Sequence, residues 1–227
     1  MSFLLFQGSV AIYLLSAAAY LVFFLTQKTP LRRTGRAIFL VAFLLHTANI
    51  IARAVETGHT PITSHHETIS FFAWSAGCCY LSFRWRYTVK NLGVFVSFLV
   101  LSLMLIAAFA PRGAAPLPPA LQSWWLPVHA SIALFADGFL SLACIGGVMY
   151  LLQEREIKNK RFGLFYSRLP SLEALDKLNY HCLSVGFPLF TLGLITGSFW
   201  AKQAWGAYWH WDPKETWALI TVMIYSV

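Results

Sequence analysis

The sequence predicts an all-α fold, a polytopic bundle of transmembrane helices. Only 11% of its 227 residues are charged, 58% are hydrophobic, and mean hydropathy is +0.61. A soluble domain carries about 25% charged residues, so this chain is expected to face lipid over much of its surface. No internal repeat or low-complexity linker divides it. We therefore expect a single membrane domain over residues 1–227.

Six apolar runs approach the length that crosses a bilayer, about 20 residues. They cover residues 3–25, 37–55, 67–83, 92–110, 126–152 and 178–200, and a seventh begins at 213. The first run is too long for the apolar core of a signal peptide. The third is the least regular, because it is short and contains Trp74, Gly77 and the pair Cys78-Cys79. The sequence thus predicts six full spans plus a truncated seventh.

The net charge of +8 is distributed so that it indicates topology. Thirteen of the seventeen Lys and Arg residues lie in or beside the connections 28–36, 84–90 and 155–177. By the positive-inside rule these connections face the cytoplasm. The N-terminus and residues 200–217 are then expected on the outside. The basic charge is a topology signal, and we expect no nucleic-acid partner.

Residues 200–217 contain five of the nine tryptophans, namely Trp200, Trp205, Trp209, Trp211 and Trp217. Tryptophan collects at membrane–water interfaces, which explains some of them. So many in one connection favour a flat aromatic platform for a flat, apolar ligand. Asp212, Pro213 and Glu215 have the spacing of a helix N-cap, first helical position and capping box. A new helix is expected from Pro213, with Asp212 as its cap.

Ionisable residues inside the spans are candidates for function, because burying them in lipid is unfavourable. His129 falls in an early turn of the fifth span, on the same side as the tryptophans. It could contact lipid headgroups or ligate a metal. Asp137 lies two turns further on a similar face, and His46 lies in the second span. Both could be pocket residues or helix–helix hydrogen-bond partners.

The other histidines and the cysteines give weaker signals. His59, His65 and His66 lie within eight residues, but their spacing matches no structural zinc pattern, so we expect solvated loop histidines. The four cysteines, Cys78, Cys79, Cys144 and Cys182, form no Cys-x-x-Cys motif. They are expected to pack in the bundle, and the chain is not itself a c-type cytochrome.

The pattern Trp205-Gly-x-x-Trp209-x-Trp211-Asp212 resembles the tryptophan-rich "WWD" signature of membrane haem-handling proteins. The run from Gly197 to Thr221 is similar to the CcsA/ResC family of System II cytochrome c biogenesis. Weaker similarity extends to Gly58-His-x-Pro61, to His129 and to residues 151–154. The resemblance therefore covers most of the chain.

The resemblance implies a membrane subunit of a cytochrome c synthetase, or haem lyase. Haem b would be held as a bound substrate on the outer face and attached to Cys-x-x-Cys-His motifs of apocytochrome c. His129 would be an axial ligand of the haem iron. The implied partners are a CcsB/ResB-type membrane protein, apocytochrome c and the lipid bilayer, in a bacterial plasma membrane or a thylakoid membrane. The implied haem-binding residues are His129, Trp200, Trp205, Gly206, Trp209, Trp211, Asp212 and Trp217.

The sequence departs from the family pattern after Pro213. Family members continue with a late histidine in that span, a second outward histidine and a further span, and this sequence has none of them before Val227. The expectation is therefore a truncated chain that lacks half of the haem ligands, unless His59, His65 or His66 substitutes, and that is incomplete as an enzyme. Two alternatives stay open: a small-molecule transporter or quinone-binding redox subunit that uses Asp137 and His46, and an inactive scaffold.

Overall fold

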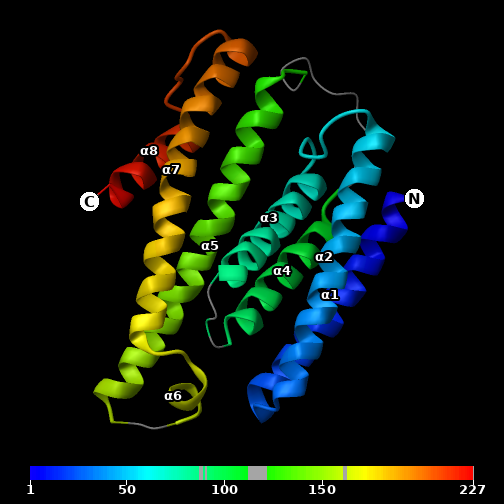
Figure 1. Cartoon of the computed structure of the whole chain (residues 1–227). Coiled ribbons are helices and arrows are strands. Elements are labelled where there is room, and N and C mark those ends of the chain that lie inside the picture. Colours follow the sequence, from blue (N-terminus) through cyan, green and yellow to red (C-terminus); the bar gives the residue numbers. More distant parts are fainter. Residues whose placement is uncertain (87–88, 90, 112–121, 161–162, 227) are drawn as a thin grey trace.

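The computed structural model confirms the all-α prediction. It describes residues 1–86, 89, 91–111, 122–160 and 163–226, which contain helices and no strand (Figure 1). The helices of these ranges are α1 (Ser2–Thr26), α2 (Thr29–Thr57), α3 (His65–Arg86), α4 (Leu92–Phe109), α5 (Trp125–Lys158), α6 (Leu164–Arg168), α7 (Leu172–Trp205) and α8 (Pro213–Tyr225).

Five helices of the described ranges are long and apolar enough to cross a membrane: α1, α2, α4, α5 and α7. The expected third span corresponds to α3, which has 22 residues but is not among these five. It lies inside the bundle, where Ala73, Ala76 and Tyr80 are almost completely buried. A helix covered by other helices has less need of apolar residues all round, so α3 carries buried serines such as Ser75 without facing lipid.

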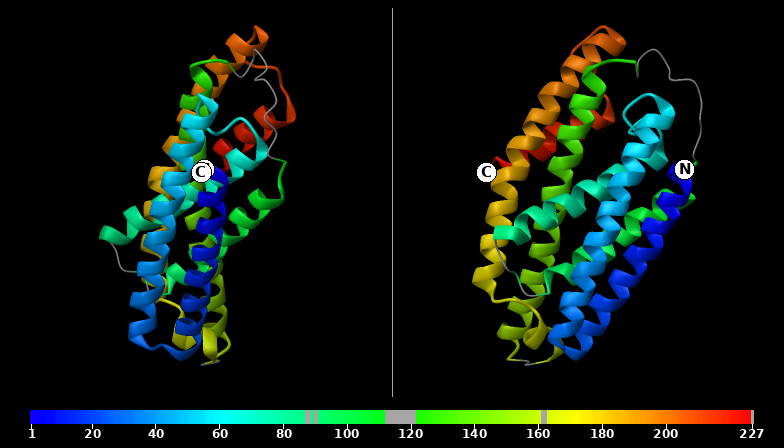
Figure 2. Two further views of the ribbon diagram at one scale, coloured as in Figure 1. Left: turned by 90° about the vertical axis from the view of Figure 1, so that its right-hand side faces the viewer. Right: turned by 45° about the vertical axis from the view of Figure 1, so that its right-hand side comes forward.

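Two long antiparallel pairs flank a central layer. Figure 1 and the right-hand view of Figure 2 show the α1–α2 pair and the α5–α7 pair on opposite sides of α3 and α4. Direct packing joins α1 to α2, α5 to α7, α1 to α4, and α3 to both α4 and α5. The largest fully buried side chains, which form the core between these layers, include Tyr13, Phe39, Tyr80, Met104, Leu142 and Met149.

Local sequence signals fix the helix ends that matter for the site. Residue Gly58 ends α2 and Gly206 ends α7, both with positive φ, 73° and 86°, a conformation that glycine adopts without steric cost. The side chain of Asp212 accepts a hydrogen bond from the Glu215 N–H and caps α8, as predicted. The chain reverses direction between the end of α7 and the start of α8, so α8 lies beside α7 (Figure 1). None of the α8 residues is buried.

Candidate functional site

A cavity of about 350 Å³ lies between α5, α7, the connection 206–212 and the start of α8. This volume is within the range of small-molecule pockets, about 300–1,000 Å³. Most of its wall is apolar and aromatic, and a few charged groups stand at α8. Its lining consists of His129, Ala133, Phe190, Gly193, Leu194, Gly197, Ser198, Trp200, Ala201, Trp205, Tyr208, Trp209, Asp212, Lys214, Glu215 and Ala218.

Among the residues that line this cavity, His129 has the side chain whose nitrogen lone pair can bind a metal. Its Nδ1 lies 2.8 Å from the main-chain carbonyl oxygen of Gly193. A carbonyl only accepts, so Nδ1 carries the proton and donates. In the neutral ring Nε2 is then the unprotonated nitrogen. Hydrogen bonding of the second ring nitrogen is how metal-ligating histidines are usually oriented, so the arrangement suits a metal ligand.

Aromatic rings continue from His129 along the cavity wall. Trp200 is nearly parallel to the His129 ring, with centroids 6.2 Å apart and an interplanar angle of 6°. Trp205 meets Trp200 edge-on at 4.8 Å, and His210, which is outside the lining, meets Trp205 edge-on at 5.8 Å. Edge-to-face pairs of this kind are favourable by about 0.5–1.5 kcal/mol beyond the area they bury. The wall is therefore a set of mutually supported rings.

One residue of the cavity lining, Trp209, has an unusual polar atom. Its Nε1 is buried and has no hydrogen-bond partner among the described residues. A buried N–H without a partner is unfavourable by about 1–3 kcal/mol, so such atoms are uncommon in folded proteins. An acceptor atom on a bound ligand would remove this penalty.

The connection between α7 and α8 is held by its own hydrogen bonds. The ammonium group of Lys202 donates to the Gly206 carbonyl at 2.7 Å. The Glu215 carboxylate accepts from the His210 N–H at 2.6 Å, while the Asp212 carboxylate accepts from the Glu215 N–H at 2.7 Å. The first turn of α8 thus fixes the loop that carries the tryptophans.

The cavity brings together most of the residues that the sequence singled out. His129, Trp200, Trp205, Trp209 and Asp212 all line it. The other three predicted residues are not among the lining residues. Gly206 caps α7; Trp211 packs edge-on against Trp209 at 5.6 Å and is 70% exposed; and Trp217 is 68% exposed on α8.

Several lining residues were not predicted from the sequence. Gly193 and Gly197 are spaced by four residues on α7 and lie under His129. Their Gly-x-x-x-Gly spacing, which is typical of close helix pairs in membranes, was the available signal. Lys214 supplies a cation at the start of α8, near the carboxylates of Asp212 and Glu215. A cation at an otherwise apolar cavity suits a ligand with carboxylate groups.

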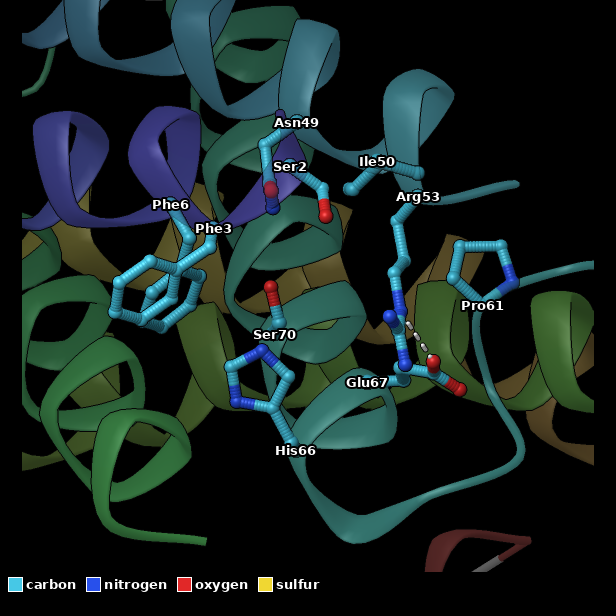
Figure 3. A pocket seen from close by; sticks show the side chains of 10 residues that line it. All are labelled: Ser2, Phe3, Phe6, Asn49, Ile50, Arg53, Pro61, His66, Glu67 and Ser70. Atoms are coloured by element: carbon cyan, nitrogen blue, oxygen red, sulfur yellow. Dashed lines mark hydrogen bonds and ion pairs between the residues drawn. The ribbon is translucent and has the colours of Figure 1, made fainter. Parts of the chain in front are cut away.

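A second hollow lies between α1, α2 and α3, and Figure 3 shows its lining side chains. Arg53 donates to Glu67 at 2.8 Å, and Asn49, His66 and Ser70 lie near this pair. Its volume is about 70 Å³, which is room for a few water molecules, since a cavity needs about 10–15 Å³ on this measure to hold one. The hollow is too small for a flat macrocyclic ligand.

The histidines of the 59–66 segment do not come together. His59 Nδ1 lies 3.1 Å from the Thr60 carbonyl oxygen, His66 Nδ1 lies 2.6 Å from that of Ala107, and His65 is exposed. Within the described ranges, no three His, Cys, Asp or Glu side chains are grouped so as to hold a metal ion. His66 is therefore a packed residue of the second hollow and differs from the solvated loop residue that we expected.

Two further ionisable residues lie apart from the cavity lining. His46 is fully buried, with Nε2 at 3.0 Å from the Ser70 Oγ and Nδ1 at 3.5 Å from the Tyr13 hydroxyl. These contacts make it a hydrogen-bond link between α1, α2 and α3. Asp137 is half-buried on α5, one turn beyond the lining residue Ala133.

Comparison with known proteins adds independent information. Residues 62–227 match the family described as "Cytochrome C assembly protein". The chain is 34% identical over 221 residues to the cytochrome c biogenesis protein CcsA of Parasynechococcus marenigrum (strain WH8102), covering 86% of this chain and 72% of the relative. It is 32% identical over 196 residues to CcsA of Chlamydomonas reinhardtii, covering 82% of this chain and 54% of that protein.

A solved structure has the same fold. The cytochrome c haem lyase CcmF superposes with a TM-score of 0.71 at 16% identity, covering all of this chain and 40% of CcmF. At that identity the likeness concerns the fold alone. The sequence matches over most of the chain are sufficient for assignment: this protein belongs to the CcsA family of cytochrome c assembly proteins.

Proposed function

We propose that this chain is the subunit of a cytochrome c synthetase that binds haem in the α5–α7–α8 cavity and presents it on the outer face of the membrane. The observation that carries the proposal is the His129 ring, whose Nδ1 is tied to Gly193 and whose Nε2 is left with a lone pair at an aromatic cavity. Imidazole nitrogen is a common axial ligand of haem iron.

The donor set fits haem. A porphyrin is flat and largely apolar, and Trp200, Trp205 and Trp209 supply rigid aromatic surface. Propionate carboxylates need cations or N–H donors, and Lys214 and the unpartnered Trp209 Nε1 are of that kind. Trp211 and Trp217, which are exposed and outside the cavity lining, would contact lipid headgroups or a partner instead.

This chain would assist the reaction by holding the haem vinyl group and the cysteine thiol close together in the correct orientation. A thioether forms when the S–H of an apocytochrome cysteine adds across a haem vinyl group: sulfur bonds to one vinyl carbon and hydrogen to the other, with no external oxidant or reductant. His129 and the tryptophan wall would hold the vinyl edge toward the incoming Cys-x-x-Cys-His motif. Holding two reactants in the correct geometry can supply several kcal/mol of the barrier reduction.

Membrane placement and partners follow from charge and family. The strongly basic connections 28–36, 84–90 and 155–177 favour the cytoplasmic or stromal side. Residues 200–217 then form an outward-facing haem-binding segment of a single membrane domain. A CcsB/ResB-type membrane protein and apocytochrome c are the proposed partners, in a bacterial plasma membrane or a thylakoid membrane.

The test is haem retention by the full chain purified with its membrane partner. We expect a Soret band that is lost or shifted in His129→Ala and restored by added imidazole, which can enter the vacated space. His181→Ala is the matched control, because His181 lies on α7 far along the helix, beside Phe83. Absence of haem from the wild-type complex, or an equal effect of both substitutions, would contradict the proposal.

A further inference from the structure

Two glycines of α7 adjoin His129, Gly197 through its Cα and Gly193 through its carbonyl. A Cβ atom added to Gly197 would stand 2.8 Å from Cε1 and 3.0 Å from Nδ1 of His129. Separations under 3.0 Å require something to shift. The imidazole therefore occupies the space that any other residue at position 197 would fill with its own side chain.

Gly193, one turn earlier, has a different relation to the same ring. Its carbonyl oxygen accepts the hydrogen bond from His129 Nδ1 at 2.8 Å. A Cβ atom added there would meet the Cα of Ala133 at 3.4 Å, which is an ordinary van der Waals contact, and none of its three nearest neighbours would be an atom of His129. Gly197 supplies clearance for the ring, and residue 193 supplies the acceptor.

We propose that Gly197 and the Gly193 carbonyl are positioning elements for His129, which seat the imidazole against α7 and fix the tautomer that leaves Nε2 unprotonated. This proposal adds positioning residues to the proposed haem-binding site and rests on that proposed function. The geometry itself is a property of the haem-free protein. The His129 ring of α5 is nearly parallel to the ring of Trp200, at 6°, and Trp200 lies on α7, the helix that carries both glycines.

Helix packing alone does not account for this arrangement. Gly186 on the same helix also lets α5 approach closely, and its added Cβ would lie 3.1 Å from Phe139 and 3.2 Å from Leu140. That site has only aliphatic and aromatic neighbours and is a plain packing glycine. At position 197 the close neighbour is a polar ring whose second nitrogen is already bound to the helix backbone.

The first experiment needs no haem. The full chain is labelled with ¹⁵N-histidine, and the His129 signals are assigned by their loss in His129→Gln. We expect a protonated Nδ1 and an unprotonated Nε2 in wild type and in Gly193→Ala, whose carbonyl remains. Gly197→Ala should shift the Nδ1 signal or give a mixture of tautomers. An unchanged His129 spectrum in Gly197→Ala would overturn the proposal.

A double-mutant cycle covers the case in which Gly197→Ala folds poorly. If the added methyl collides with the ring, truncating the ring should relieve it. Gly197→Ala should lower Tm by about 4 °C or more in wild type and by less than about half of that in a His129→Ala background. Gly147→Ala, whose Cβ would meet nothing within 4 Å, is the control for a glycine change in a helix. Equal losses in both backgrounds would show that residue 197 serves packing only.

The haem-loaded complex separates this proposal from the function on which it rests. With haem bound, Gly197→Ala should shift the Soret band in the same direction as His129→Ala, and the control Gly147→Ala, which lies outside the cavity lining, should not. If neither wild type nor any variant binds haem, the proposed function fails. The ¹⁵N measurement then still tests whether Gly197 and the Gly193 carbonyl position His129. If His129→Ala shifts the band and Gly197→Ala does not, the seat fails and haem ligation stands.

Discussion

The Nδ1 of His129 on α5 donates to the main-chain carbonyl of Gly193 on α7 across 2.8 Å. This bond joins the two 34-residue helices at the cavity and leaves Nε2 as the unprotonated nitrogen. The same contact thus serves helix pairing and ligand geometry. Changes that disturb either helix near this bond are expected to alter haem binding.

Asp212 should matter through its cap. Asp212→Ala removes the acceptor of the Glu215 N–H, and loss of an N-cap is unfavourable by about 1 kcal/mol. Because the same turn holds the His210 N–H through Glu215, the tryptophan loop should loosen and haem retention should fall. Asp212→Asn keeps a capping oxygen and should retain most haem. Ser171→Ala, which removes the cap of α7 at its other end, controls for cap loss, and an equal haem loss there would contradict this account.

The tryptophans should separate into two groups. Trp205→Ala removes a cavity wall and the edge-on contact with Trp200, so haem affinity should fall by about tenfold or more, equivalent to about 1.4 kcal/mol. Trp217→Ala changes a side chain that is 68% exposed and outside the cavity lining, so its effect should be less than about threefold, under about 1 kcal/mol. Titration of haem into the purified complex measures both, and the reverse order would exclude this cavity.

Trp209→Phe tests the unpartnered Nε1. In the haem-free protein the substitution deletes a buried N–H without a partner, so stability should stay constant or rise by up to about 1 kcal/mol. If the atom donates to a bound carboxylate, haem retention should fall in the same variant. Thermal unfolding with and without haem measures the two effects. Haem retention equal to that of wild type in Trp209→Phe would show that Nε1 makes no hydrogen bond to the bound ligand.

His46 should be a structural residue. His46→Leu leaves the Ser70 hydroxyl without its ring-nitrogen partner in a buried setting, which is unfavourable by about 1–3 kcal/mol. We expect a lower Tm and an unchanged Soret band per folded protein. Tyr13→Phe, which removes the longer 3.5 Å contact to the same ring, should have a smaller effect. Loss of the Soret band in folded His46→Leu would give His46 a functional role.

Local sequence patterns were sufficient to predict where α8 starts but not to predict the buried helix α3. Asp212, Pro213 and Glu215 predicted the start of α8 because capping depends on residues three apart in sequence. The regularity of α3 was harder to judge, since its apolar character is diluted by serines that other helices cover. Trp211 and Trp217 shared a tryptophan-rich segment with Trp205, yet both are largely exposed and lie outside the cavity lining, which the segment itself did not indicate.

The sequence by itself determined the fold class, the family and most of the aromatic wall, because hydropathy, charge bias and a dense tryptophan motif are properties of short segments. Only the tertiary structure decided which residues meet. His129 and Gly193 are 64 positions apart, and nothing local in either segment specifies their contact. It arises because α5 and α7 pack closely enough at small residues for a ring to reach a backbone carbonyl. That closeness turns a histidine in a membrane helix into an oriented imidazole at an aromatic cavity.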